Sequence, residues 1–321
     1  MTSALSAPHF HNEEAAYAYV EARIWPNGPF CPHCGCTDRI SAIKPNKAAR
    51  VRLGLKKCGD CKKQFTVKVG TVFEQSHVPL NVWLQAVALI TSSKKGFSSN
   101  QLHRILGVTL KTAWFMSHRI REAMMDDGSE PPTGSNGGFL EVDETFLGRD
   151  AETFVSGKGW RGGSGKKKIV TMVERGGRAR SVKIDSLHKP EIERALSYAS
   201  RDAVLITDEA QHYKRLGLEF AGHESVEHGA EEWRNGNAYT NTVEGFFSIF
   251  KRGMRGIYQH CSEKHVHRYA AEFDFRYSNR AKLGVDDAER AERALKGITG
   301  KRLTYRTVGA RRPGAEARVV W

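Results

Sequence analysis

The sequence predicts an α/β or α+β domain in which helices flank a sheet, preceded by a small cysteine-rich segment and a helical segment. Three observations predict this order. Four apolar runs of strand length lie between residues 139 and 210, and one helix-like stretch precedes the last of them. Two Cys-x-x-Cys pairs lie within residues 31–61, and apolar residues at helical spacing occupy residues 80–125. Strands that alternate with helices pack in layers around one core.

Composition limits the class of protein. At 321 residues the chain is long enough for two or three domains, and its hydrophobic share of 40% is ordinary for a globular protein. No stretch reaches the roughly 18 uninterrupted apolar residues of a membrane span, and the first residues lack the pattern of a secretory signal. We therefore expect a cytoplasmic, nucleoid-associated protein with no membrane partner.

The net charge of +14 predicts a polyanionic partner. Residues 1–125 contain 17 Lys and Arg against 7 Asp and Glu, whereas residues 126–321 contain 33 against 29. The basic excess therefore lies in the N-terminal third, where it would attract DNA phosphates regardless of base sequence. A basic surface that serves only solubility is the alternative.

Changes in composition suggest five parts. Residues 1–75 hold a short helix and the cysteine-rich segment, and residues 76–126 hold a predicted helix-turn-helix DNA-binding region. Residues 127–138 are rich in Gly, Ser and Pro and indicate a linker. Residues 139–280 form the sheet-containing domain, and residues 281–321 form a basic C-terminal tail.

The two Cys-x-x-Cys pairs have the spacing of a Cys₄ zinc ribbon. Cys31 and Cys34 form the first pair and Cys58 and Cys61 the second, and 23 residues separate the pairs. Each pair can direct two thiolates at one tetrahedral Zn²⁺, and four protein ligands leave no open position, so the site would be structural. Disulfides are the alternative, which an intracellular location disfavours. Cys36 breaks the spacing and is left out of the site.

The run FSSNQLHRILGVTLKTAWFMSHRIREAM predicts a helix-turn-helix. Ser98 or Ser99 can cap the first helix, Gly107 can form the turn, and Thr109 opens the second helix. Buried positions are expected at Leu102, Ile105, Leu106, Ala113, Met116, Ile120 and Met124. The outer face of the second helix would present Lys111, Thr112, Arg119 and Arg121 to a DNA major groove. A plain helical hairpin gives the same pattern.

Residues 240–256, TNTVEGFFSIFKRGMRG, predict an amphipathic helix. At about 100° per residue, the two opposite faces are easily separated. The polar face carries Asn241, Glu244, Ser248, Lys251 and Arg252, and the apolar face carries Val243, Phe246, Phe247, Phe250 and Met254. The apolar face fits a core. The polar face fits a solvated surface, a helix cap or the rim of an active site.

Three carboxylates form a candidate metal site. Asp143 lies within the predicted strand FLEVDETF, Asp208 ends the apolar run AVLITD, and Glu244 follows on the amphipathic helix. Buried charges are costly unless they are paired or bind a metal. Two strand aspartates and a helix glutamate supply the hard oxygen ligands that a two-metal phosphoryl-transfer site needs for Mg²⁺.

Each carboxylate also has a structural explanation. Asp143 could pair with an arginine, and Asp208 could cap a following helix. Asn241 and Glu244 fit a capping box, with Asn241 at the N-cap and Glu244 at the third helical position. The three positions alone leave the metal site and these alternatives open.

Taken together, these segments resemble the insertion-sequence transposases that join an N-terminal zinc ribbon to an ISXO-like DDE domain. The matching segments run in order from about residue 15 to residue 305. They are FCPHCG, KKCGDCKKQFTVKVGTVF, EVDETFLG, VERGGRARSVKI, ITDEAQHY, TNTVEGFFSIFKRGMRGIYQH and HRYAAEFDFRYSNR. The segment that begins TNTVEGFF is highly specific, whereas the zinc ribbon alone would not be.

The resemblance implies an RNase H-like mixed sheet with flanking helices and a metal-dependent DNA cut-and-join reaction, with Mg²⁺ or Mn²⁺ as catalytic ion. By position, Asp143 and Asp208 match the two aspartates of the family and Glu244 matches the third acid. Some members have Asn as the third ligand, so Asn241 is the alternative. Within VEHG, His228 is retained in a stretch that commonly reads V-N-H-S, which would give it a supporting role. The resemblance also implies DNA contact by Lys251, and by its neighbours Arg252 and Arg255.

The sequence thus favours a transposase that binds double-stranded DNA, both transposon ends and target. A zinc-ribbon and helix-turn-helix DNA-binding regulator on an inactive scaffold is one alternative, and an RNase H-like nuclease or resolvase that cuts without joining is another. Because the reaction must hold two DNA ends, we expect a homodimer or a higher assembly on DNA.

Overall fold

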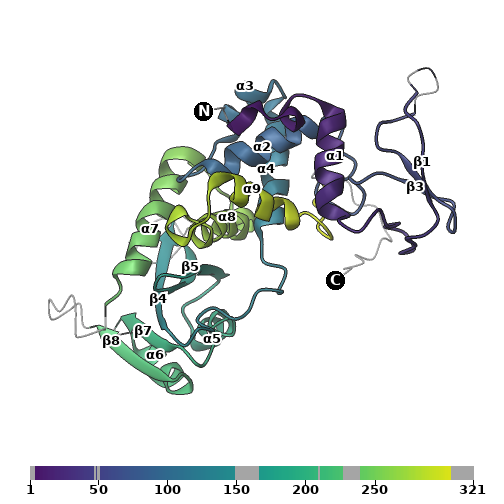
Figure 1. Ribbon diagram of the computed structural model, residues 1–321. Helices are drawn as coiled ribbons and strands as arrows, with labels where there is room; N and C mark the ends of the chain where they lie inside the picture. Colours follow the sequence, from purple (N-terminus) through teal and green to yellow (C-terminus); the bar gives the residue numbers. More distant parts are fainter. Residues whose placement is uncertain are drawn as a thin grey trace, which may run out of the picture. The chain divides into compact units, whose positions relative to one another are not determined.

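The computed structural model describes residues 4–46, 48, 51–148, 166–208, 210–226 and 239–304. Its internal contacts divide the described chain into two compact units (Figure 1). The first unit comprises the described parts of residues 1–93, 97–124 and 287–321, and the second comprises residues 94–96 and those of 125–286. The five consecutive parts predicted from the sequence are not the same division as these two discontinuous units, and they stay predictions.

The first unit is a helical assembly with a small antiparallel sheet. Its helices are α1 (Glu13–Ile24), α2 (Leu80–Ser92), α3 (Ser99–Leu106), α4 (Leu110–Met124) and α9 (Asp287–Lys296), and short 3₁₀ turns η1 (Ala4–Ser6) and η2 (Pro8–Phe10) precede them. The sheet has the order β1 (Ile40–Ala42), β2 (Lys56–Cys58), β3 (Gln64–Phe65). Helix α9 packs against α1, α2 and α4, although it comes from the far end of the chain.

The predicted helix-turn-helix elements are present in this unit. The Ser98 side chain accepts a hydrogen bond from the Gln101 backbone N–H, and the Gln101 side-chain oxygen accepts one from the Ser98 backbone N–H, which forms a capping box. Gly107 ends α3 with a left-handed φ of 66°, and Thr109 Oγ1 accepts the Thr112 N–H at 3.1 Å at the start of α4. Burial is confirmed at Leu102, Ala113, Met116, Ile120 and Met124. The expectation for Ile105 is wrong, because its side chain is 59% exposed on a short helix that packs only around Leu102.

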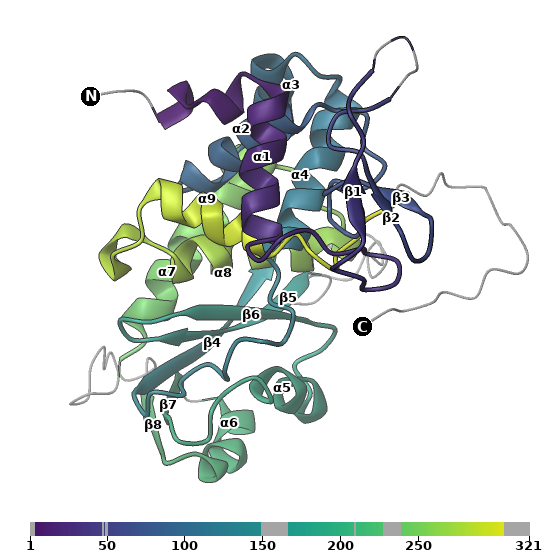
Figure 2. The ribbon, with the colours of Figure 1, turned by 45° about the vertical axis from the view of Figure 1, so that its right-hand side comes forward.

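The second unit is built on a five-stranded mixed sheet in the order β6-β5-β4-β7-β8 (Figure 2). The strands are β4 (Phe139–Leu147), β5 (Lys167–Glu174), β6 (Ala179–Ile184), β7 (Val204–Asp208) and β8 (Gly222–Val226). Neighbours β4, β5 and β6 are antiparallel, whereas β4, β7 and β8 are parallel. The predicted fold class, a mixed sheet with flanking helices, is confirmed. Strand β8 was not predicted, since GHESV lacks a clear apolar alternation.

Alternation along β4 sends successive side chains to opposite faces of the sheet. One face, with Leu140 and Val142, packs against α5 (Lys189–Leu196) and α6 (Gln211–Leu216). The other face, with Leu147, packs against α7 (Asn241–Gly253) and α8 (Val266–Ser278). The remaining short turns are η3 (Gly217–Glu219), η5 (Met254–Tyr258), η6 (Glu263–His265) and η7 (Ala281–Leu283). Within the described ranges, no helix is long and apolar enough to cross a membrane.

Candidate active site

Four cysteine sulfurs converge at the edge of the small sheet in the first unit. One sulfur from each of Cys31, Cys34, Cys58 and Cys61 lies within 4.8 Å of the others. The Sγ atoms of Cys31 and Cys61 are 3.6 Å apart, as are those of Cys34 and Cys58. Four thiolates at this spacing fit one tetrahedral Zn²⁺, so the donor set suits a structural zinc site. The two pairs predicted from the sequence meet, and Cys36 lies outside the group.

A second group, which we call the acidic cluster, lies in the second unit and consists of Asp143, Glu144 and Asp208. One carboxylate oxygen from each lies within 4.8 Å of the others, and all three side chains are half-buried. Strands β4 and β7 are parallel neighbours, and β7 ends at Asp208 beside the part of β4 that carries Asp143. The sheet thus brings together two of the predicted acids, which are 65 positions apart in the sequence.

Glu144 is the member that sequence reasoning missed. As the neighbour of Asp143 on a strand, it belongs to the opposite face of the sheet, where Tyr213 of α6 donates a hydrogen bond to its Oε1 at 2.6 Å. Tyr213 is fully buried, and burial together with the Glu144 carboxylate holds the pKa of its hydroxyl well above the ordinary range. The hydroxyl therefore stays a donor. The adjacent letters D-E at 143–144 were the only sequence signal, and strand alternation argued against it.

Burial and the repulsion between neighbouring carboxylates both act on Asp143 in the acidic cluster. Burial raises the pKa of Asp143 to about 7, and the negative charges of Glu144, Asp208 and Glu244 act in the same direction. A hydrogen bond from the Glu144 backbone N–H to Asp143 Oδ1, 2.7 Å long, opposes this shift. Asp208 Oδ1 accepts the Ala210 N–H at 3.1 Å. Several carboxylates held together in this way fit a divalent cation with hard oxygen ligands.

Glu244 lies outside the group of three, although its charge acts on Asp143. Its side chain is exposed in the first turn of α7, and its Oε1 accepts a hydrogen bond from Thr240 Oγ1 at 2.9 Å. Asn241 is also exposed and is the first residue of the helix. The capping-box alternative is therefore wrong, because Thr240 and not Asn241 occupies the N-cap.

A buried carboxylate from β4 caps α7 instead. Glu141 is 0% exposed, and its Oε2 accepts the backbone N–H groups of Thr242 and Val243 at 2.7 and 3.0 Å. Its Oε1 accepts the Thr242 hydroxyl at 2.7 Å and Arg175 Nε at 2.6 Å. A negative charge at a helix N-terminus is favoured by the free N–H groups and the helix dipole. Glu141 thus fixes the end of α7 from which Glu244 projects, two positions along β4 from Asp143.

The rest of the amphipathic helix follows the predicted division. The apolar side chains Val243, Phe246, Phe247, Phe250 and Met254 are buried. On the polar face, Ser248, Arg252 and Arg255 are exposed, and Lys251 is half-buried with its Nζ 5.7 Å from the ring centroid of Phe247. Arg252 folds back along the helix and donates to the Ser248 backbone oxygen at 3.0 Å.

Two residues of α4 that were predicted to contact DNA are buried, so the prediction of an outer position is wrong for them. Arg119 is only 5% exposed, and its guanidinium donates to the backbone oxygens of Val72, Glu74 and Leu303. Arg121 is 1% exposed and donates to Ser117 Oγ at 3.1 Å. Both positions face inward because α4 is covered by the other segments of the first unit. Lys111 is exposed and Thr112 half-buried, as an outer face requires. His228 lies outside the described residues.

Comparison with known proteins gives two family matches. Residues 136–278 match the ISXO2-like transposase domain, and residues 11–64 match the transposase zinc-ribbon domain. An uncharacterized protein in transposable element ISH50 of Halobacterium salinarum is 27% identical over 265 residues, which cover 77% of this chain and 86% of that protein. These matches confirm the resemblance to insertion-sequence transposases with a zinc ribbon and an ISXO-like domain.

One solved structure also matches this chain, with low structural similarity. The crystal structure of a pre-cleavage Mos1 transpososome matches 67% of this chain and 78% of that chain at 13% sequence identity. Its TM-score is 0.18, which is too low to support an argument about the fold.

Proposed function

We propose that this protein binds the ends of an insertion sequence and catalyses metal-dependent phosphodiester hydrolysis followed by strand transfer into target DNA. The observation that carries the proposal is the acidic cluster, which lies at the carboxyl end of β7 inside the segment that matches the transposase domain. A regulator that only binds DNA has no need to keep several repelling carboxylates together. The same proposal includes Zn²⁺ on the four cysteines as a structural ion.

Asp143 and Asp208 would hold Mg²⁺ or Mn²⁺, and Glu244 from α7 would complete the set, with Asn241 as its alternative. The bound ions would activate the attacking hydroxyl and stabilise the leaving 3′-oxygen. Glu144 is a fourth carboxylate within reach of the same position, and the buried Tyr213 hydroxyl orients it. Glu141 caps the end of α7 that carries Glu244, and it lies two positions along β4 from Asp143.

DNA would be held by cations of both units. Arg252 and Arg255 are exposed on α7 and the turn that follows it, and Lys251 lies beside them. Lys111 and Thr112 lie at the start of α4, where a helix N-terminus can approach a DNA groove. Contacts of these cations with phosphates would make binding strongly dependent on salt. A homodimer or higher assembly is expected on DNA, because two ends react together.

The test is a cleavage and strand-transfer assay with labelled DNA that carries the ends of the element, in the presence of Mg²⁺. Wild-type protein should cut and join, and Asp208→Asn should lose both reactions while it still binds DNA. Asp202→Asn is the matched control, because Asp202 is an exposed aspartate just before the same strand. DNA binding by the wild type without cleavage in Mg²⁺ or Mn²⁺ would favour the regulator instead. Cleavage without joining would favour a nuclease or resolvase.

A further inference from the structure

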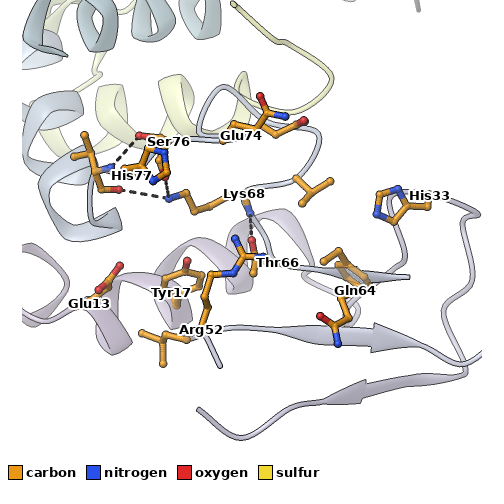
Figure 3. Close-up of a pocket in the computed structure, with 15 residues that line it drawn as sticks. Glu13, Tyr17, His33, Arg52, Gln64, Thr66, Lys68, Glu74, Ser76 and His77 are labelled. Atoms are coloured by element: carbon orange, nitrogen blue, oxygen red, sulfur yellow. Dashed lines mark hydrogen bonds between the residues drawn. The ribbon is translucent and has the colours of Figure 1, made fainter. Parts of the chain in front are cut away.

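A pocket of about 620 Å³ opens in the first unit between α1, strand β3 and the loop that leads from β3 to α2 (Figure 3). Several of its lining residues are close in sequence to the four cysteines, but none of the cysteines lines the pocket. Pockets of about 300–1,000 Å³ are typical of small-molecule sites, whereas a single phosphate would fill only a small part of this volume. The pocket therefore has room for a ligand of nucleotide size.

Two cations from different segments line this pocket. Arg52 comes from the loop before β2, and Lys68 comes from the loop after β3 (Figure 3). Lys68 donates to the backbone oxygens of Ser76 and Val78 at 2.8 and 3.4 Å, which anchors its ammonium at the wall. Burial lowers the pKa of Lys68, the charge of Glu13 opposes this shift, and the charges of Arg52 and Arg119 act in the same direction as burial. Within the described part of the chain, neither side chain forms an ion pair, so an anion would relieve their repulsion.

The two acids of the pocket do not neutralise these cations. Glu74 accepts the Gly70 N–H at 3.0 Å and pairs with Arg302 at 3.4 Å, so its charge is already compensated. Glu13 is exposed and lies in the first turn of α1, where the helix dipole stabilises it. The pocket thus keeps a surplus of positive charge.

Part of the remaining wall is apolar, beside polar side chains such as Gln64, Thr66 and His77. Leu53, Val69 and Val78 line it as half-buried side chains, and Tyr17 of α1 contributes a ring. Gly54, with a φ of +69°, crosses this ring so closely that an added Cβ would lie 2.3 Å from it. Only glycine allows this approach, because any larger side chain would overlap the ring. A flat apolar ligand group beside a cationic end would match such a wall.

We propose that this pocket binds one deoxynucleotide unit, with its phosphate at Arg52 and Lys68 and its base against Tyr17, Leu53 and Val69. The unit is either a nucleotide extruded from a DNA strand or a free nucleoside monophosphate. Only the choice of DNA as its source rests on the proposed function. An extruded nucleotide would give the zinc-ribbon unit a contact with a base, in addition to the sequence-independent attraction of its surface cations.

The test measures binding of the four deoxynucleoside 5′-monophosphates to the full-length zinc-loaded protein by calorimetry, without divalent metal at the acidic cluster and without transposon ends. The matching nucleosides and inorganic phosphate are measured in parallel. The deciding variant is Arg52→Met, because this side chain is exposed and its loss leaves the packing intact. Lys63→Met is the matched control, since Lys63 is an exposed cation of the same ribbon outside the pocket.

We expect at least one monophosphate to bind, and Arg52→Met to weaken it about tenfold or more, as loss of a charge-assisted hydrogen bond predicts. Lys63→Met should have no effect, and nucleosides and inorganic phosphate should each bind more weakly than the monophosphate. The absence of saturable binding for all four nucleotides, or equal losses in both variants, would overturn the proposal.

A short single-stranded oligonucleotide and its abasic analogue identify the source. If DNA supplies the unit, the oligonucleotide binds more tightly than the monophosphate, and the abasic analogue loses that advantage. If the source is free nucleotide, the oligonucleotide has no advantage. Failure of the cleavage assay would leave these results unchanged, so the two proposals can fail separately.

Discussion

The four-cysteine group and the acidic cluster are both candidate metal sites, but the chain builds them in opposite ways. The sulfurs come from two short turns within 31 residues, and Cys31 and Cys58 are almost fully buried. The carboxylates come from two parallel strands, and they remain half-buried. A closed set of four soft ligands suits a structural ion, whereas an open set of hard ligands suits a catalytic ion with free positions for substrate.

Because the two groups are built differently, we expect the cysteines to determine stability and the carboxylates to determine activity. Removal of a cysteine ligand should unfold its surroundings, because the ion holds the small sheet together. Removal of a carboxylate should relieve repulsion in the metal-free protein while it abolishes the chemistry. Variants that change one property and not the other therefore test whether the two groups of ligands have these separate roles.

The largest effect is expected for Cys58→Ser. Binding of structural zinc contributes about 10–16 kcal/mol of apparent free energy in zinc-finger peptides, so this variant should lose both the ion and the fold of the ribbon. Zinc content should fall from about one ion per chain to almost none, and hydrogen exchange should become fast in β1–β3 only. Cys36→Ser should retain zinc, because Cys36 lies outside the group. Equal loss of zinc in both variants would contradict the assigned ligand set.

Asp143→Asn should lower the cleavage rate by on the order of a thousandfold, because it removes a central ligand of the acidic cluster. Its thermal unfolding temperature in the absence of divalent metal should be equal to or above that of the wild type. The reason is that Asp143 faces the charges of Glu144, Asp208 and Glu244. Single-turnover cleavage and calorimetry measure the two effects. A marked loss of stability would show that the carboxylate is structural, like the cysteines.

Glu141→Gln should destabilise the second unit by about 2–4 kcal/mol, because Arg175 loses its buried partner and α7 loses a charged cap. We expect slower cleavage with little change in DNA affinity, since Glu141 contacts neither metal nor DNA in the proposed function. Denaturant unfolding and the kcat-to-KM comparison measure this. Glu224→Gln is the control, because Glu224 is an exposed glutamate of the same sheet. Unchanged stability would exclude a role for Glu141 as the cap of α7.

Asp274 is a half-buried carboxylate that belongs to neither site. Burial raises its pKa to about 7, although Ser181 donates to it through its backbone N–H and its hydroxyl, each at 2.7 Å. Because the folded pKa lies above the unfolded value, the stabilisation is complete at low pH and is lost as pH rises through about 7. Unfolding free energy should fall by roughly 1 kcal/mol between pH 6 and pH 8 on this account.

The variant Asp274→Asn should remove that part of the pH dependence and leave the acidic cluster unchanged. An asparagine can still accept from the Ser181 N–H and donate to its hydroxyl. Urea unfolding at the two pH values measures the effect. A pH profile identical to that of the wild type would mean that Asp274 is not the titrating group.

The sequence predicted the elements that have strong local signals. The cysteine spacing, the Ser98 cap, the Gly107 turn and the apolar face of α7 each depend on residues within a few positions of one another, and all are confirmed. The strand order was not predicted, since periodicity alone gives no pairing of distant strands. Asp143 and Asp208 were grouped by residue type as one candidate metal site among open alternatives, and the resemblance then favoured that site.

The errors have one physical origin, which is tertiary contact. Arg119 and Arg121 fall on the outer face of a lone α4, but distant segments cover that face. Glu141 forms the cap of α7 in place of the capping box that Asn241 and Glu244 offered as an alternative, because the end of α7 meets β4. Glu144 joins the acidic cluster against the alternation rule, because a glutamate is long enough to reach past the strand. Apart from the adjacent acids at 143–144, none of these contacts leaves a signal in the local sequence.

The return of the far end of the chain to the first unit has a consequence for protein synthesis. Thr299 pairs with Thr71, and α9 packs on α2 within that unit. Chains generally fold from the N-terminus as they leave the ribosome. Here the first unit cannot be completed until almost the whole chain has been translated, so the second unit can fold first. A prematurely terminated transcript would yield a folded sheet without a finished zinc-ribbon unit, so completion of that unit depends on full-length translation.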